Sequence, residues 1–335
     1  MSRKSVLSIA VSVLMIAAAA VCIFSGRDAL ASGARWGAGY FPNVPLVTQD
    51  GKTVHFYDDL LKGKTVAIDL IYTHCVDSCP LETARLAQAQ KLLGDRVGKD
   101  IYFYSITIDP KRDTPAVLKA YAEKYHAGPG WLFLTGKPSD IDLISKKLGL
   151  YTDPDADNRD GHGTQLMVGN VPTGQWMQNS ATEDPHFLAI QLETYINGWK
   201  GHSTQPTRSY AEATVMDVKS KGQYLFATRC VACHTIGHGV RIGPDLLGVT
   251  NIRDHAWLTK FIQKPDEMVE ARDPIAMRLF KKYNGVQMPN VNLGPQDVQY
   301  LIEYLEKETK DLHKPAADAK TWSVVSTSAN PGAQN

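Results

Sequence analysis

The sequence predicts two domains, an α/β domain followed by an all-α domain, on three observations. The chain has 335 residues, which is long for one ordinary domain. Strand-like and helix-like segments alternate up to about residue 200, and strand-like segments are absent after about residue 210. Four of the five cysteines form two close pairs, Cys75/Cys79 and Cys230/Cys233, so each domain carries one pair.

The first 31 residues have the features of an export signal. Positive residues Arg3 and Lys4 precede an uncharged, mostly apolar run over residues 6–24, and residues 29–31 (ALA) form a small-x-small cleavage site. The run is close to the roughly 20 residues that cross a bilayer, so an uncleaved membrane anchor is the alternative. In both cases we expect the rest of the chain in the periplasm or on the outer face of the cytoplasmic membrane.

The first domain is expected over residues 40–200. The apolar run 66–72 predicts a buried strand, because it is short and bounded by turn residues. Thr114 and Pro115 suit the N-cap and the first position of a helix. The other expected elements are helix 81–93, strand 101–108, helix 115–125, strand 131–134, helix 139–148, a hairpin over 165–168 and 175–177, and a closing helix over 185–199.

The second domain is expected over residues 210–312, after a polar linker at 201–209 and before a disordered tail at 313–335. Helical patterns cover 218–229, 254–263, 274–283 and 295–310. An apolar share of 43% allows two packed cores. A formal net charge of +1 provides no basic face for phosphate contacts, so no nucleic-acid partner is expected.

The segment from Cys230 to His234 is a C-x-x-C-H motif, the attachment sequence of c-type haem. Two thiols on one helical turn can form thioethers with the haem vinyl groups, and the adjacent imidazole then faces the iron. Met288, a soft donor in a loop before the last predicted helix, is the candidate for the second axial ligand. We therefore expect one covalent haem c with His234 and Met288 as axial ligands. A redox or zinc-binding C-x-x-C that precedes a histidine is the alternative.

Residues 218–312 resemble class I cytochrome c. The positions that carry the resemblance are those of the helix crossing, the loop beside the proximal histidine and the distal ligand loop: Gly222, Phe226, Tyr304, Gly243-Pro244 and Met288-Pro289. In that family a carbonyl of the Gly-Pro loop orients the proximal imidazole. The resemblance implies an all-α cytochrome c fold and electron transfer to or from a partner.

Cys75 and Cys79 lie between a predicted strand and a predicted helix, with Pro80 in the first helical turn. Cysteines four residues apart at a helix start can share a face, and the helix dipole favours the thiolate. Thiolates select Cu(I), and a two-sulfur site needs a third donor, for which an imidazole is suited. A structural disulfide in an oxidising compartment is the alternative.

Residues 40–199 resemble the Sco (SenC) family. The resemblance rests on Tyr72-Thr73-x-Cys75-x-x-x-Cys79-Pro80, on Ile108-Asp109-Pro110-x-x-Asp113-Thr114-Pro115, and on a histidine before the late hairpin, His162. It implies a thioredoxin-like fold, copper bound by Cys75, Cys79 and His162, and a role in cytochrome c oxidase assembly. Two features depart from the family: Val76 replaces a common proline, and glycines flank His162. Asp109 and Asp113 are expected to hold the site as loop and cap residues.

Two functions fit this combination, and the first is favoured. A metallochaperone would carry copper to the copper subunit of a respiratory oxidase or to another periplasmic thiol or copper protein, with the haem exchanging an electron. Alternatively, a thiol–disulfide oxidoreductase would use Cys75 and Cys79 as its catalytic redox pair and the haem as electron port. A third option is an electron carrier whose first domain is vestigial. Whether the chain is an enzyme stays open.

Overall fold

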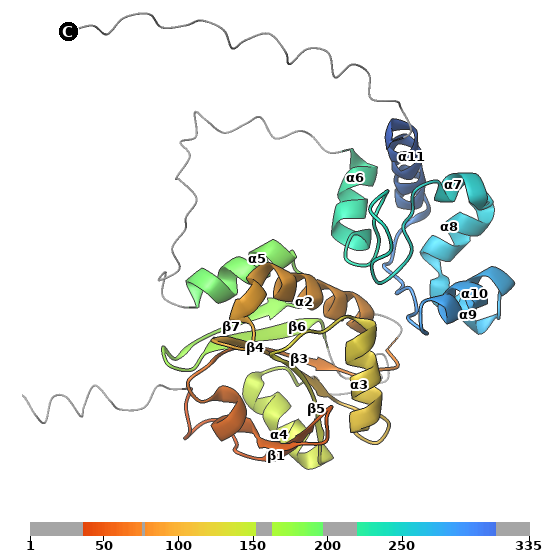
Figure 1. Ribbon diagram of the computed structural model, residues 1–335. Coiled ribbons are helices and arrows are strands. Elements are labelled where there is room, and N and C mark those ends of the chain that lie inside the picture. Colours follow the sequence, from red (N-terminus) through yellow and green to blue (C-terminus); the bar gives the residue numbers. More distant parts are fainter. Residues whose placement is uncertain (1–35, 76–77, 152–162, 197–219, 313–335) are drawn as a thin grey trace, which may run out of the picture. The chain divides into compact units, whose positions relative to one another are not determined.

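Figure 1 shows the computed structural model of the protein, which describes residues 36–75, 78–151, 163–196 and 220–312. The chain divides into two units, residues 1–213 and 214–335. The expected signal or anchor, the linker and the tail lie outside the described residues. None of the described helices combines the length and apolar character that crossing a membrane requires.

A seven-stranded mixed sheet forms the centre of the first unit, in the order β2-β1-β5-β4-β3-β6-β7. The three central strands β3, β4 and β5 are parallel, and the flanking pairs are antiparallel. Every residue of β3 is buried, as expected for a strand with neighbours on both edges and helices over both faces. The strands are β1 (Pro45–Thr48), β2 (Thr53–His55), β3 (Thr65–Ile71), β4 (Ile101–Thr107), β5 (Trp131–Gly136), β6 (Gln165–Asn170) and β7 (Gln175–Ser180).

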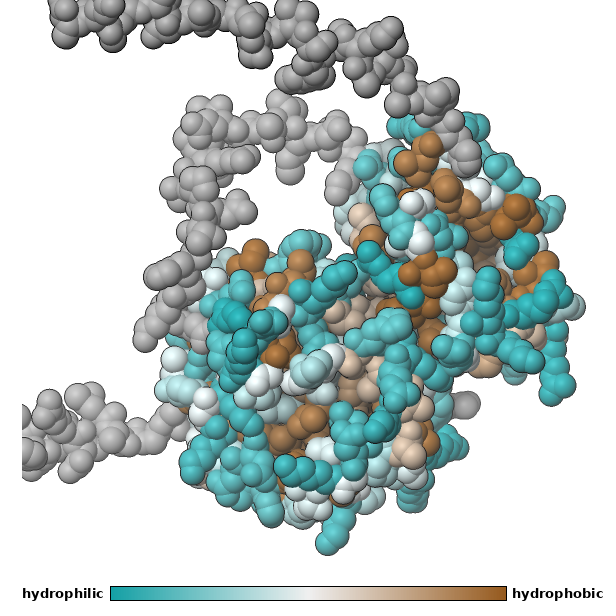
Figure 2. All heavy atoms as spheres, viewed as in Figure 1, coloured by the Kyte–Doolittle hydropathy of each residue, from teal (hydrophilic) through white to brown (hydrophobic). Residues whose placement is uncertain are grey.

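Helices cover both faces of this sheet (Figure 1). On one face, Val66, Ile68 and Leu70 of β3 share a core cluster with residues of α4 (Pro138–Leu148) and of the π-helical turn η1 (Phe56–Leu61). On the other face lie α2 (Cys79–Leu93), α3 (Pro115–Lys124) and α5 (Pro185–Ile190). There Tyr121 of α3 packs on Phe133 of β5, with ring centroids 6.0 Å apart. Figure 2 shows hydrophilic side chains over most of the visible surface of this unit.

The predicted α/β fold is confirmed, with strands and helices close to their expected positions. Thr114 caps α3 as expected, because its Oγ1 accepts a hydrogen bond from the Val117 N–H at 3.4 Å. The prediction of a single closing helix over 185–199 is wrong in one respect. α5 ends at Ile190, and the chain continues as a π-helical turn, Gln191–Tyr195. In this turn the Ile196 N–H donates to the Gln191 carbonyl. β1, β2 and η1 are not predicted from the sequence, because they are too short for a periodic pattern.

The second unit is helical, and its described residues contain no strand, only an isolated bridge between Thr235 and Asp245. Its first helix crosses its last at Gly222, where an added Cβ would lie 2.0 Å from the Tyr300 carbonyl oxygen, so only glycine fits. The predicted all-α fold is therefore confirmed. Its elements are α6 (Lys221–Leu225), the π-helical turn η5 (Phe226–Cys230), α7 (Val249–Ile252), α8 (His255–Gln263), α9 (Pro265–Glu270), α10 (Pro274–Lys282) and α11 (Pro295–Leu312).

Candidate metal and haem sites

Cys75 and Cys79 lie together where β3 ends and α2 begins. Cys75 is in the loop after β3, and Cys79 is the first residue of α2, followed by Pro80 in its first turn. The cysteines are 8% and 0% exposed and form a small apolar cluster with Tyr72 and Ile108. The fold therefore gathers two soft donors in a nearly dry environment, which suits a thiophilic ion.

The protonation of Cys79 differs from the expectation based on the helix dipole. A hydrogen bond with the Cys75 side chain raises the pKa of the Cys79 thiol well above its ordinary value, and burial and the nearby groups of Cys75 and Glu82 act in the same direction. A backbone hydrogen bond at Tyr72 opposes them without prevailing. Desolvation and neighbouring groups outweigh the dipole, so a metal entering this site must displace a proton from Cys79.

The third predicted copper donor, His162, lies outside the described residues. Within the described part of the chain, no group of three or more His, Cys, Asp or Glu side chains could hold a metal ion. His74, although adjacent to Cys75, is engaged elsewhere: its Nε2 lies 2.9 Å from Arg112 Nη1 and 3.7 Å from Asp109 Oδ2. The described residues thus fit two of the three expected copper ligands, Cys75 and Cys79.

Asp113 ties together the two strand ends beneath the cysteine loop. Its fully buried carboxylate accepts hydrogen bonds from the Thr73 N–H at 3.1 Å, from Thr73 Oγ1 at 2.6 Å and from Thr107 Oγ1 at 2.5 Å. Thr73 precedes Cys75 by two residues, and Thr107 ends β4. Asp113 therefore holds the site as a buried strand-end clamp, whereas the helix cap is Thr114.

A second support, which the sequence does not predict, holds the first turn of α2. Thr83 Oγ1 donates to the Cys79 carbonyl at 2.8 Å and lies 2.9 Å from the hydroxyl of Tyr121 on α3. Burial raises the pKa of Tyr121 well above its ordinary value, so this hydroxyl keeps its proton. No motif could have revealed the contact, because Thr83 and Tyr121 meet only through the packing of α2 on α3.

In the second unit, the predicted haem attachment residues form a tight turn. Cys230 ends η5 and is part of the hydrophobic core, with 8% exposure. The Cys233 and His234 N–H groups both donate to the Cys230 carbonyl, at 3.1 and 2.9 Å. This places the two thiols and the imidazole on one turn, as thioether attachment and axial ligation require.

The imidazole of His234 is held in a ligating form. Its Nδ1 lies 2.9 Å from the Pro244 carbonyl, and because a carbonyl oxygen only accepts, Nδ1 carries the proton and Nε2 keeps a lone pair for iron. Burial lowers the pKa of His234, and the bond to Pro244 only partly offsets this, so the ring is neutral. Gly243 packs flat against the ring: an added Cβ would lie 2.6 Å from Cε1.

Met288 lies in the loop between α10 and α11, partly buried and followed by the buried Pro289. Two histidines of this unit, His238 and His255, are alternative donors for the distal position. His255 is engaged elsewhere, since its Nε2 lies 3.3 Å from Glu306 Oε1 at the surface. The other, His238, is an exposed residue four positions after His234. The residues of this unit therefore fit a covalent haem c, with Met288 as the predicted distal ligand.

Residues 41–186 match the SCO1/SenC family, and residues 220–308 match cytochrome c. The chain joins a SCO1/SenC domain to a cytochrome c domain. Relatives of the SCO1/SenC domain include SCO1 homolog 1 of Arabidopsis thaliana mitochondria, which is 33% identical over 32% of this chain and 30% of that protein. The SCO2-like protein of Rickettsia felis is 36% identical over 32% of this chain and 49% of that protein. Protein SenC of Rhodobacter capsulatus is 35% identical over 32% and 46%. The matches thus span half or less of each relative's length.

Solved structures similar to parts of the chain come from both families. A SCO1/SenC family lipoprotein from Bacillus anthracis is 26% identical, covering 49% of this chain and 98% of its own, with a TM-score of 0.41. Bradyrhizobium japonicum ScoI with copper bound is 27% identical, covering 44% and 94%, with a TM-score of 0.38. A cytochrome c domain from Pseudomonas putida is 49% identical, covering 28% and 92%, with a TM-score of 0.27.

Proposed function

We propose that this SCO1/SenC–cytochrome c protein is exported and binds copper through Cys75, Cys79 and His162. It delivers copper or electrons to the copper subunit of a respiratory oxidase, or to another periplasmic thiol or copper protein, during oxidase assembly. The observation that carries the proposal is the pair of buried thiols at the start of α2, in a chain that also has a cytochrome c domain. The proposed location is the periplasm or the outer face of the cytoplasmic membrane.

The residues around the two thiols suit a soft ion that must be held and then released. Tyr72 and Ile108 keep the sulfurs nearly dry, which favours Cu(I) over harder, hydrated ions. The proton on Cys79 competes with the metal, so copper is released to a partner whose own thiolates replace it. A third donor on a separate loop, His162, would complete the site.

The cytochrome c domain would supply an electron path. When bound, the haem supplies a one-electron couple. Cys230 and Cys233 would hold it covalently, and His234 and Met288 would bind the iron, with Pro244 fixing the ring of His234. Such a couple could set the oxidation state of copper or of the thiols, or pass an electron to a partner.

Metal analysis of the full chain, produced in a host that matures c-type haem, tests the proposal. We expect about one copper and one haem per chain, with copper lost in the Cys75→Ser/Cys79→Ser variant and strongly weakened in His162→Ala. His186→Ala is the matched control, because His186 is an exposed residue at the start of α5. Copper that is retained in the double cysteine variant would refute copper binding at this site.

A thiol–disulfide oxidoreductase is the second candidate, favoured by the hydrogen bond between Cys75 and Cys79. Oxidising the two thiols to a disulfide releases two electrons and two protons, so one haem would have to accept and pass on one electron twice. In this case His162→Ala should leave disulfide exchange intact, because the thiols alone perform it. Fast exchange by a copper-free protein, unaffected by His162→Ala, would favour this function.

A further inference from the structure

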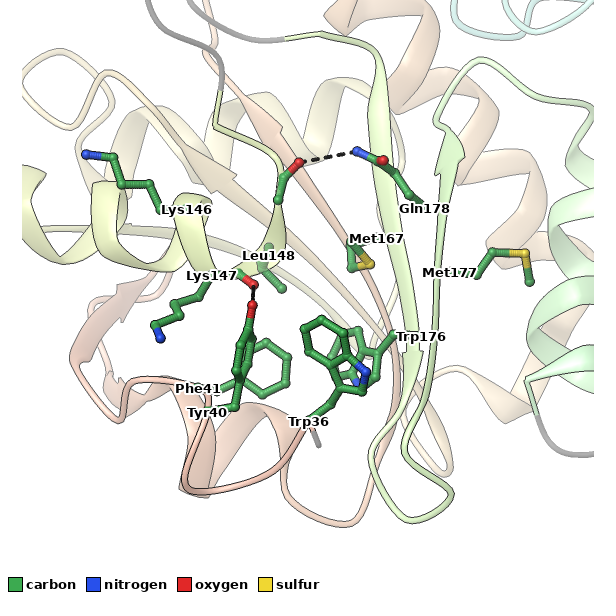
Figure 3. Close-up of a pocket in the computed structure, with 11 residues that line it drawn as sticks. Trp36, Tyr40, Phe41, Lys146, Lys147, Leu148, Met167, Trp176, Met177 and Gln178 are labelled. Carbon is green, nitrogen blue, oxygen red and sulfur yellow. Dashed lines mark hydrogen bonds between the residues drawn. The ribbon is translucent and has the colours of Figure 1, made fainter. Parts of the chain in front are cut away.

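A pocket with aromatic walls lies beside the segment where the described chain begins. Its volume is ≈ 190 Å³, and the rings of Trp36, Tyr40, Phe41 and Trp176 line it (Figure 3). None of its described lining residues belongs to the cysteine site. The SCO1/SenC chemistry proposed above does not use this pocket.

The aromatic walls are tightly built. The Trp36 and Tyr40 rings meet edge to face with centroids 4.6 Å apart, and the Phe41 and Trp176 centroids are 4.8 Å apart. Gly169 pairs with Trp176 across β6 and β7, and a Cβ at Gly169 would lie 2.3 Å from the indole ring. Glycine is thus required there for the indole to lie on the sheet and form the pocket wall.

The edge of the pocket is positively charged. Lys146 and Lys147, in the last turn of α4, line it, and no acidic residue does so among the described residues. The Lys147 ammonium lies 4.7 Å from the Tyr40 ring centroid, and the Lys146 ammonium lies 4.5 Å from that of Tyr151. Aromatic rings with lysines that reach past them are typical of protein surfaces at the bilayer interface.

The sequence before the pocket indicates which surface it meets. The apolar run expected to cross the membrane ends at Phe24, twelve positions before Trp36. Even fully extended, that stretch spans only roughly 40 Å. If the run is retained as an anchor, the pocket stays within reach of the bilayer surface throughout the life of the protein.

We propose that this pocket docks on the anionic phospholipid surface of the membrane that anchors the chain. The two lysines face lipid phosphates, and the aromatic slot takes the upper part of an acyl chain. This inference rests on the anchored form of the proposed function. It would orient the SCO1/SenC domain on the membrane with the α4 face of its sheet toward the lipid.

Amine labelling of the full chain in lipid vesicles tests the docking. With a membrane-impermeant amine reagent and mass spectrometry, Lys146 and Lys147 should label several-fold more slowly in phosphatidylglycerol vesicles than in phosphatidylcholine vesicles. Lys91 on α2 and Lys111 before α3 are exposed and should label equally in both. Equal labelling of Lys146 and Lys147 in the two lipids overturns the proposal.

A matched pair of variants tests the contribution of charge. In Lys146→Gln/Lys147→Gln the equilibrium constant for docking on the anionic surface should fall about thirtyfold. Each basic residue near such a surface contributes about 1 kcal/mol, and every 1.4 kcal/mol corresponds to a factor of ten. The readout is protection of Met167 in the pocket from oxidation, which Lys91→Gln/Lys111→Gln should leave unchanged. Protection that survives in the first variant overturns the proposal.

The same preparations separate this proposal from the proposed function. A chain that leaves the vesicles on alkaline washing has no anchor, which overturns the docking while copper and haem content still report on the metal sites. A chain that stays bound but labels equally overturns the docking alone. A full chain that binds no copper, but whose pocket lysines are protected in phosphatidylglycerol vesicles, would contradict the chaperone function and leave the docking supported.

Discussion

At the residue scale, the orientation of His234 depends on one glycine. Replacing Gly243 by alanine would place a Cβ 2.6 Å from His234 Cε1, so the ring must turn away from the Pro244 carbonyl. We expect Gly243→Ala to lower the stability of the haem-loaded domain by about 1–3 kcal/mol, the usual cost of overpacking. The measurement is denaturant unfolding followed by haem absorbance. Gly294→Ala, which has open space around it, is the control for added bulk and should cost less.

Asp113 supports the cysteine site indirectly. Its three hydrogen bonds described above come from Thr73 and Thr107, not from Cys75 or Cys79. Asp113→Ala would leave the buried Thr107 hydroxyl and the partly buried Thr73 hydroxyl and N–H without their acceptor, and a buried polar group left unpaired costs about 1–3 kcal/mol. We expect a loss of several kcal/mol in unfolding experiments and weaker Cu(I) retention in competition with a chelator. Asp109→Ala, at a partly exposed position, should cost less. Equal stability of the Asp113→Ala variant and the wild type would contradict the clamp.

At the element scale, Asp273 joins two helices of the haem-binding unit. As N-cap of α10 it accepts from the Ile275 and Ala276 N–H groups, both at 2.9 Å, and it also accepts from Trp257 Nε1 of α8 at 3.2 Å. The Ala276 N–H is the main cause that lowers the pKa of Asp273. A lowered folded-state pKa adds stability above the unfolded value, about 3.9, and this stability is lost as the pH falls through the folded value.

We therefore expect Asp273→Ala to destabilise this unit at pH 7 by about 0.5–2 kcal/mol, the usual cost of losing an N-cap. The difference from the wild type should shrink as the pH is lowered below about 4. Asp273→Asn keeps the capping oxygen and should retain most of the stability at pH 7 while losing its pH dependence. Thermal unfolding across this pH range is the measurement, and a difference independent of pH would contradict the assignment.

How well the sequence predicted an element depended on its length and on local chemistry. The β3 strand and α3 were predicted because a continuous apolar run and a Thr-Pro start are encoded within the segment itself. The short strand β1 exists because β5 offers it an edge, and β2 in turn pairs with β1, so both depend on tertiary structure. The raised pKa of Cys79 likewise depends on burial and on Cys75, so the spacing of the motif could not show it.

At the scale of the whole molecule, the two sites belong to cores that share no residue. The cluster that contains Cys75 and Cys79 has only residues of the first unit, and the cluster around Cys230 has only residues of the second. The attachment turn, the Pro244 contact and the Met288 loop also lie within the second unit. Haem loading should therefore not depend on the thiols of the SCO1/SenC domain.

We expect Cys75→Ser/Cys79→Ser to keep a full complement of haem with an unchanged absorption spectrum, since the haem attachment residues belong to a unit with its own core. Conversely, Met288→Ala should alter the haem spectrum and lower its reduction potential, because a soft axial sulfur raises it. The same Met288→Ala protein should bind copper as the wild type does. The measurements are visible absorption, redox titration and copper content on the same preparations. A fall in haem content on removing the two thiols would show instead that the SCO1/SenC domain takes part in maturing or stabilising the cytochrome.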